Sequence, residues 1–319
     1  MTLPPKSHRS HPVRLSPGEI NARLASLYGP CVLCELRCGA MRDHGERGAC
    51  GLDHRTHVYN RLLHMGEEAP LVPSYTLFLS ACNLMCSFCS EWKHLTPPFT
   101  RSAIEPEQLA TKAAADLERY QARVRTIRNI NFVGGEPSIA LPFIARFAEA
   151  LTAQIGQHPP LLLNTNGYMT PEALALATHL CPIMVVDLKF GPGDCAESIA
   201  GIPNYWEFLT RNLTLLHQAI VQPHDPPQVD GVPVLPVQLW VRHLLMPNHL
   251  ACCTAPCLEW LARNAPQAHV NVMPAFFPFK GQGNDAWPHL KSSERDEGLA
   301  LLHRSGLARA YFDGRRVVS

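Results

Sequence analysis

The stretch YTLFLSACNLMCSFCSEW, residues 75–92, joins a β-rich run to three closely spaced cysteines. Three residues separate Cys82 from Cys86, and two separate Cys86 from Cys89. A closed zinc site and a filled cubane cluster each take four protein thiolates, so a set of three leaves one metal position open. In parallel α/β folds, functional groups gather at the C-terminal ends of strands. The stretch therefore predicts a strand followed by an open metal site.

Short β-rich runs alternate with longer amphipathic helical patterns from residue 75 onward. This alternation predicts βαβ units and a parallel sheet, and Thr170 before Pro171 has the pattern of a helix N-terminus. The proline-rich residues 221–236 are expected to form a surface loop. Strands are expected at residues 75–80, 128–133, 160–165, 182–190, 236–245 and 268–273. The fold class is therefore expected to be α/β, a partial (β/α)6 TIM-like barrel with a small cysteine-rich N-terminal segment.

Residues 1–73 differ from the rest of the chain. They begin with a helical pattern at residues 16–29 and continue as a short, glycine-rich, cysteine-bearing stretch. We place a domain boundary near Pro73. Residues 1–73 form an N-terminal cysteine-rich segment in this prediction, and residues 74–319 form a core domain with a C-terminal extension.

The composition is that of a globular protein, with 46% apolar and 17% charged residues among 319. Lys and Arg total 28 against 27 Asp and Glu, so the net charge of +1 offers no field for nucleic acid or an anionic membrane. The N-terminus lacks the apolar region of a secretory signal, and no apolar run reaches about 18 residues. We expect a cytoplasmic protein without nucleic-acid or membrane partners. Twelve cysteines in a reducing compartment indicate metal binding.

The spacing of Cys82, Cys86 and Cys89, with the aromatic Phe88 before the last cysteine, resembles the signature of the radical S-adenosylmethionine (SAM) superfamily. The resemblance implies a 4Fe–4S cluster whose fourth iron is chelated by the methionine end of SAM, with Phe88 beside the adenine. It implies reductive cleavage of SAM to a 5′-deoxyadenosyl radical that abstracts hydrogen. On the three cysteines alone, the alternatives are a zinc site completed by a distant ligand and unrelated buried cysteines.

Gly134, Gly135 and Glu136 follow the second expected strand in the stretch NFVGGEPS. Two adjacent glycines let the backbone approach a ligand closely, and a glutamate can accept hydrogen bonds from an ammonium group. A Gly-Gly pair alone is most often a plain turn. In this context the motif resembles the family's Gly-Gly-Glu sequence, which implies binding of the SAM amino group.

Asp187 and Lys189 fall on one face of the fourth expected strand, where an inward charged pair is costly unless it is functional or mutually satisfied. A buried ion pair without a ligand is the alternative. Asp-x-Lys resembles the glycyl-radical-enzyme activases, which implies cofactor contacts for both residues. The same resemblance implies a cofactor contact for His243, although a lone strand histidine is more often a core residue. It also makes Asn164 and Asn166 candidates for lining the site.

The N-terminal segment carries Cys31, Cys34, Cys38 and Cys50, which are enough thiolates to close a tetrahedral site. A structural zinc, a second iron–sulfur cluster and no metal at all remain open, because the spacing does not decide among them. Further along, Cys252, Cys253 and Cys257 open an expected helix, and we slightly favour burial over ligation for them. Cys181 is expected in the core, and no role is predicted for Cys195.

The resemblance narrows to a branch related to the pyruvate formate-lyase activating enzyme that carries an N-terminal cysteine segment. The leading hypothesis is a radical SAM oxidoreductase that cleaves SAM reductively to abstract hydrogen, and an activase of this class would take the hydrogen from a backbone glycine of a protein partner. Direct chemistry on a small molecule or peptide is the alternative within the class, and a non-catalytic iron–sulfur or zinc protein is the alternative outside it. The chemistry implies a low-potential electron donor such as a flavodoxin or ferredoxin.

Overall fold

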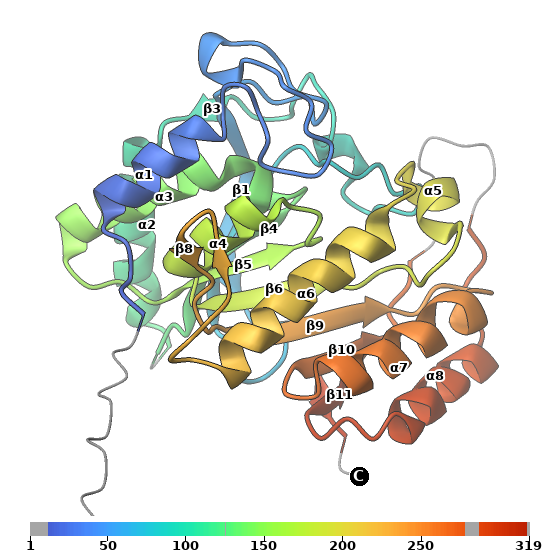
Figure 1. Cartoon of the computed structure of the whole chain (residues 1–319). Helices are drawn as coiled ribbons and strands as arrows, with labels where there is room; N and C mark the ends of the chain where they lie inside the picture. The colour runs from blue at the N-terminus through green and yellow to red at the C-terminus, as the bar shows by residue number, and fades with distance from the viewer. Residues whose placement is uncertain (1–11, 125, 278–286, 318–319) are drawn as a thin grey trace, which may run out of the picture.

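The computed structural model describes residues 12–124, 126–277 and 287–317, and a ten-stranded sheet lies at its centre (Figure 1). All six predicted strands are present, lie in chain order across the sheet and run parallel to one another. The predicted fold class is confirmed. The six strands are β2 (Ser74–Leu79), β4 (Asn129–Gly134), β5 (Leu161–Thr165), β6 (Ile183–Asp187), β9 (Gln238–Leu244) and β10 (His269–Met273).

Shorter strands extend both edges of the sheet. β11 (Ala310–Phe312) pairs parallel to β10, and β12 (Arg315–Arg316) pairs antiparallel to β11. At the other edge, β1 (Thr56–His64) is antiparallel to β2, and β3 (Ala103–Ile104) is antiparallel to β1. The N-terminal segment thus contributes β1 to the core sheet. In the proline-rich loop, β7 (Gln228–Val229) and β8 (Val232–Pro233) form a small hairpin.

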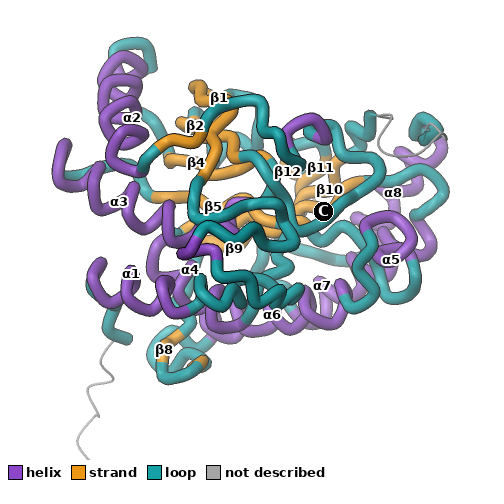
Figure 2. The backbone as a smooth tube through the Cα atoms, turned by 90° about the horizontal axis from the view of Figure 1, so that it is seen from above, coloured by secondary structure: helices purple, strands orange, loops and turns teal. Residues whose placement is uncertain are grey.

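Helices follow the strands and lie along one side of the curved sheet (Figure 2). Their starts have a local cause: the Ser16 hydroxyl accepts a hydrogen bond from the Glu19 amide, and Thr170 does the same for Ala173. Among the described residues, no helix is both long and apolar enough to cross a bilayer. The helices are α1 (Pro17–Ser26), α2 (Pro106–Gln121), α3 (Leu141–Ile155), α4 (Pro171–Leu180), α5 (Cys195–Ala200), α6 (Tyr205–Val221), α7 (Ala255–Asn264) and α8 (Ser292–Arg304), with a π-helix η4 (Leu250–Thr254) before α7.

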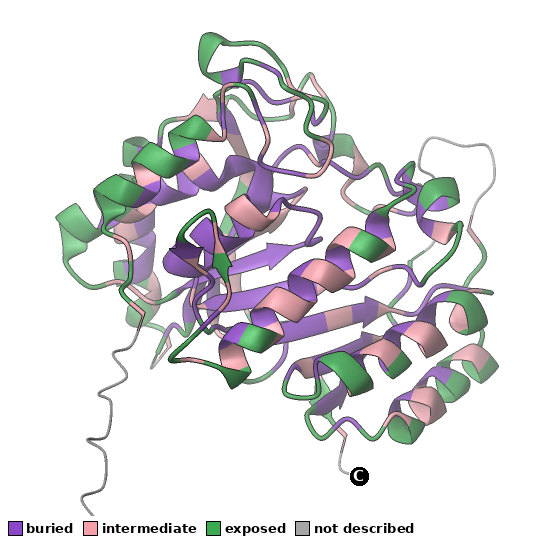
Figure 3. Cartoon of the chain, viewed as in Figure 1, coloured by how far each residue is buried: buried purple, intermediate pink, exposed green. Residues whose placement is uncertain are grey.

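The central strands are buried on both faces (Figure 3). Leu161 and Leu163 pack into the large apolar cluster, whereas Leu162 packs with Leu71 and Trp240 in a second cluster. Because side chains alternate along a strand, these two clusters lie on opposite faces of the sheet. Burial on both faces fixes the strand register, and with it the position of each strand end.

The cysteine-bearing part of the N-terminal segment lies against the C-terminal ends of the strands. Cys34 forms a β-bridge with Met169, which follows β5. Cys34 and Cys50 also pack with Ala81, which follows β2, and with Ile139. The segment therefore lies at the same end of the sheet as the three-cysteine loop.

Candidate active site

A pocket opens at the C-terminal ends of the six parallel strands. Every one of these strands contributes to its wall, either from its last residues or from the loop that follows. Such a position is where parallel α/β folds place their ligands. The wall contains Cys82, Cys86, Phe88, Cys89, Gly134, Gly135, Asn164, Asn166, Asp187, Lys189, Leu244, Phe276 and Phe277, among others.

The three cysteines reach the pocket through an unusual turn after β2. Ala81 has φ +73°, a left-handed conformation that is uncommon outside glycine. Two backbone hydrogen bonds hold it there: its N–H donates to the His94 carbonyl at 2.9 Å, and its carbonyl accepts from the Glu136 N–H at 2.8 Å. The turn thereby aims the following residues, Cys82 onward, into the pocket.

The environment of the three thiols suits a bound metal. Burial raises the pKa of Cys86 to about 12, and it raises the pKa values of Cys82 and Cys89 as well. Buried thiolates therefore need a compensating positive charge, which metal coordination supplies. The Asn166 side-chain amide also points at the Cys82 sulfur, 3.8 Å away. The donor set fits an iron–sulfur cluster held by three cysteines.

Asp187 and Lys189 form an ion pair in the pocket wall. The strand ends at Asp187 instead of continuing to the expected residue 190, so Lys189 lies two residues beyond the strand end, but both side chains still reach the pocket. The Tyr205 hydroxyl anchors this turn, because it donates to the Asp187 carbonyl at 2.6 Å and accepts from the Lys189 N–H at 3.1 Å. Burial opposes the charge of Lys189, but Asp187 raises its pKa above the ordinary value. Lys189 is therefore held as a cation.

The two glycines serve the cysteine turn as well as the pocket. A Cβ on Gly135 would stand 1.7 Å from the Ala81 carbonyl oxygen, and one on Gly134 would stand 2.4 Å from the Leu79 oxygen. Gly134 also has φ +117°, which disfavours any side chain. The sequence predicted that these glycines let the backbone approach a ligand closely. In the structure they let it approach the backbone of Leu79 and Ala81 closely. Both residues nonetheless line the pocket.

Glu136 is buried and is not among the residues that line the pocket. Its carboxylate accepts hydrogen bonds from the Ser138 N–H at 2.9 Å, the Thr165 hydroxyl at 2.5 Å and the Asn166 N–H at 2.6 Å. Burial raises its pKa, despite these bonds. In this structure Glu136 positions Asn166 instead of presenting a free carboxylate. The Thr165 contact was not predicted, although Thr165 lies between the two predicted site residues Asn164 and Asn166.

His243 is fully buried, and the structure does not place it in the pocket wall. Its Nδ1–H donates to the Leu188 carbonyl at 2.7 Å, so its Nε2 accepts from the Thr254 hydroxyl at 2.9 Å. Burial lowers its pKa to about 4, which keeps the ring neutral. A direct cofactor contact gains no support here, because both ring nitrogens bind protein groups.

Aromatic side chains form one wall of the pocket. Phe88 packs against Phe276 and Trp287, with ring centroids 5.7 and 5.6 Å apart. Phe276 is buried, whereas Phe277 is 73% exposed at the rim. The sequence analysis missed both, although their position just after the last core strand was the available signal.

The four N-terminal cysteines share one small region. Cys31, Cys34 and Cys50 are buried, and Cys38 is exposed. Fully buried Arg42 lies beside them and donates to the Cys31 sulfur at 3.7 Å, the Tyr28 hydroxyl at 3.1 Å and the Ile139 carbonyl at 3.0 Å. Among the described residues no carboxylate pairs with this guanidinium. Burial raises the pKa of Cys34 to about 12 and also raises the pKa of Cys50, and the Arg42 charge opposes this increase at Cys50. The buried cation thus favours the thiolate form that metal binding requires.

The remaining cysteines divide into two kinds. Cys181, Cys253 and Cys257 are buried, as expected. The expectation of burial is wrong for Cys252, which is exposed at the start of the helical segment after β9. Its sulfur lies 3.4 Å from that of Cys195, a contact between loops far apart in the sequence.

Comparisons with known proteins add to this geometry. The family model "Radical SAM superfamily" matches residues 76–236, which include the three pocket cysteines. An uncharacterized protein of Methanocaldococcus jannaschii is 30% identical over 254 residues, or 79% of this chain and 68% of the relative.

Solved structures resemble the chain more distantly. A domain of pyruvate-formate lyase-activating enzyme from Bacteroides vulgatus aligns at 19% identity and a TM-score of 0.38, over 57% of this chain and 97% of that one. SuiB of Streptococcus suis bound to S-adenosylmethionine aligns at 12% identity and a TM-score of 0.45, over 72% of this chain and 47% of that one.

Proposed function

The chain belongs to the radical SAM superfamily, and from that premise we propose that its strand-end pocket cleaves SAM reductively to abstract hydrogen from a polypeptide substrate. Its cofactors are the 4Fe–4S cluster and S-adenosylmethionine of that family. When bound, they supply a 5′-deoxyadenosyl radical. The observation that carries the proposal is the pocket wall itself, because three cysteines and an ion pair line it, and no fourth cysteine is among its described residues.

The side chains of the pocket have distinct tasks in this proposal. Cys82, Cys86 and Cys89 hold the iron, and their number leaves one iron for the methionine end of SAM. Lys189 and Asp187 offer opposite charges to the carboxylate and ammonium of that zwitterion. Phe88, packed among other rings, offers an apolar surface beside the cysteines.

A polypeptide substrate is supported by the rim of the pocket. Phe277 lines the opening and exposes 73% of its surface. Aromatic residues are enriched in protein–protein interfaces, and Phe277 offers one such contact at the pocket mouth. An activase, which abstracts hydrogen from a backbone glycine of its partner, needs such a surface around its mouth.

Anaerobic assays test both levels of the proposal. The chain, reconstituted with iron and sulfide and reduced with dithionite, is expected to convert SAM to 5′-deoxyadenosine and methionine. Absence of 5′-deoxyadenosine, with and without added extract, would contradict the enzyme assignment. A deuterated extract, separated by ultrafiltration, then identifies the substrate class. Deuterium in 5′-deoxyadenosine from the macromolecular fraction supports a polypeptide, whereas label from the small-molecule fraction alone supports direct small-molecule chemistry.

A further inference from the structure

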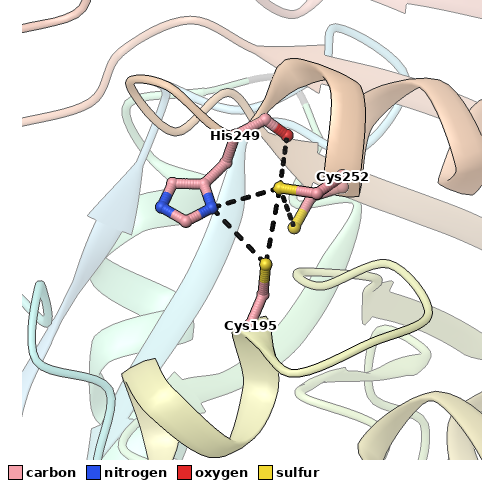
Figure 4. A group of neighbouring side chains, drawn as sticks. Cys195, His249 and Cys252 are labelled. Atoms are coloured by element: carbon pink, nitrogen blue, oxygen red, sulfur yellow. Dashed lines mark hydrogen bonds between the residues drawn. The ribbon is translucent and has the colours of Figure 1, made fainter.

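Four potential metal ligands from two separate loops meet beside the pocket. Cys195 begins α5, and His249, Cys252 and Cys253 lie at the π-helix η4. Their ligand atoms all lie within 4.8 Å of one another (Figure 4). Among the described residues, the other cysteine groups do not bring three such atoms so close together. None of the four takes part in the function proposed above.

The spacing of these atoms distinguishes one kind of metal centre from another. The Cys195 and Cys252 sulfurs are 3.4 Å apart, and the His249 Nδ1 lies 3.5 and 3.3 Å from them. The Cys253 sulfur lies 3.9 Å from that of Cys252. Zinc bonds of about 2.3 Å to sulfur and about 2.0 Å to nitrogen place tetrahedral ligands about 3.5–3.8 Å apart. The observed distances match a single ion. A cubane cluster, whose ligands bind four different irons, needs sulfurs much farther apart.

The backbone around the group is built for this close approach. A Cβ on Gly191 would stand 2.1 Å from the Cys252 carbonyl oxygen, so only glycine lets the loop after β6 lie against η4. The His249 carbonyl accepts from the amides of Cys253 at 2.8 Å and Thr254 at 3.3 Å, which gives the wide turn of a π-helix. Such turns are frequent at functional sites.

We propose that Cys195, His249, Cys252 and Cys253 bind one zinc ion in a closed tetrahedral site. Three thiolates and one imidazole complete its coordination, so it has no position for a substrate. On binding, each thiol loses its proton to solvent, and no redox step is needed.

The proposed ion connects the loops that follow β6 and β9, and both loops support the pocket. α5 contacts the cysteine loop, since the Ile199 carbonyl accepts from the Ser87 N–H at 2.9 Å. The His249 ring lies 5.7 Å from that of Trp287, which packs on Phe88 in the pocket wall. The zinc therefore has a structural role, and it holds the strand-end loops of β6 and β9 together.

Metal analysis of the full-length chain tests the proposal. Protein purified anaerobically is measured for zinc and iron per chain, beside the variants Cys195→Ala and His249→Ala. Cys257→Ala is the matched control, because Cys257 is a buried cysteine of the adjoining helix that lies outside the group. We expect Cys195→Ala and His249→Ala each to lose one zinc per chain relative to wild type and Cys257→Ala to keep it. The comparison with wild type removes any contribution from the N-terminal cysteines.

Three results would overturn the proposal: unchanged zinc in both ligand variants, a loss of iron in place of zinc, or a Cys195–Cys252 disulfide in wild-type protein isolated without zinc. A measurement on the wild type guards against variants that fail to fold. Crystals that diffract at the zinc absorption edge should give an anomalous peak among the four ligand atoms. No peak there, from protein that contains zinc, would also overturn the assignment.

Discussion

The three pocket cysteines and the four-residue group at α5 and η4 both offer cysteine thiolates, but they are arranged for different kinds of metal site. Cys82, Cys86 and Cys89 come from one short loop and face a pocket shared with an ion pair. Cys195 and Cys252 come from loops 57 residues apart, and with His249 and Cys253 they converge on one point. The pocket lacks a fourth cysteine among its described residues, whereas the other group brings four ligand atoms within 4.8 Å of one another.

The number and the spacing of its donor atoms together decide the role of a thiolate site. Three donors that surround an open pocket leave room for a ligand on the metal, as catalysis requires. Four donors packed within 4.8 Å leave no such room, so the metal can only hold the chain together.

His243 connects the two regions. It donates to the Leu188 carbonyl, between the two charged pocket residues, and it accepts from Thr254 at the end of η4. Its assignment as a cofactor contact stays a prediction from the family resemblance. The contacts themselves indicate that it fixes the position of the pocket wall relative to η4.

The largest effect is expected for Cys86→Ala. Two thiolates cannot hold the cluster, so 5′-deoxyadenosine formation should disappear. Iron and product are measured in the same anaerobic preparation, with Cys257→Ala as the control. The zinc bound at α5 and η4 should remain. Joint loss of iron and that zinc would show that the two sites are not separate.

A second variant, Arg42→Met, adds the N-terminal cysteines to the comparison. The substitution leaves the Ile139 carbonyl without its buried donor and removes the guanidinium bonds to the Asp53 carbonyl and the Tyr28 hydroxyl, which still bond to each other. We expect stability to fall by about 3 kcal/mol and metal at Cys31, Cys34, Cys38 and Cys50 to be lost. Urea denaturation and metal analysis provide the readouts, with exposed Arg123→Met as the control. If the Arg42→Met variant kept all of this metal, the positive charge of Arg42 would not be needed for metal binding at the four N-terminal cysteines.

Lys189→Met tests the role of the Asp187–Lys189 ion pair in the pocket wall. We expect the rate of SAM cleavage to fall about 10- to 100-fold, because the cysteines still hold the cluster but a cation beside it is lost. Exposed Lys112→Met, on α2, serves as the control. The assay is 5′-deoxyadenosine formation at saturating and limiting SAM. Equal rates for the two variants would mean that the ion pair is only structural.

The smallest effect concerns His243 and pH. Its folded pKa of about 4 lies below the ordinary value of 6.5, so the unfolded chain binds the proton first. Its contribution to stability is therefore complete above pH 6.5 and is lost as pH falls toward 4. Between pH 7 and 5.5 this loss amounts to about 1 kcal/mol. Urea denaturation should show that much less pH dependence in His243→Gln. Identical pH dependence would refute a buried neutral imidazole.

The three-cysteine pocket could be predicted from the sequence because its residues lie close together in the chain or at predictable strand ends. Cys82, Cys86 and Cys89 lie within eight residues, and the other pocket residues follow predictable strand ends. The roles of Gly135 and Glu136 could not be predicted, because they depend on contacts with Ala81 and Asn166 in neighbouring loops.

The group at α5 and η4 was not predicted, for a related reason. Cys195 and His249 are 54 residues apart, and they meet only because β6 and β9 are neighbours in the sheet. The β7–β8 hairpin, which intervenes in the chain, lies in a separate two-stranded sheet. The spacing of residues along the sequence does not show that β6 and β9 are neighbours in the sheet. A preference for burial was reasonable for adjacent cysteines on a helix, but it could not anticipate the partner loop.

Electron paramagnetic resonance of the dithionite-reduced chain tests the central claim most directly, namely that the three-cysteine site keeps an iron open for SAM. Spectra are recorded with and without SAM, for the wild type and for Cys86→Ala. We expect a cluster signal in the wild type whose g values shift when SAM is added, and no such signal in the variant. A wild-type cluster signal that SAM leaves unchanged would contradict the claim.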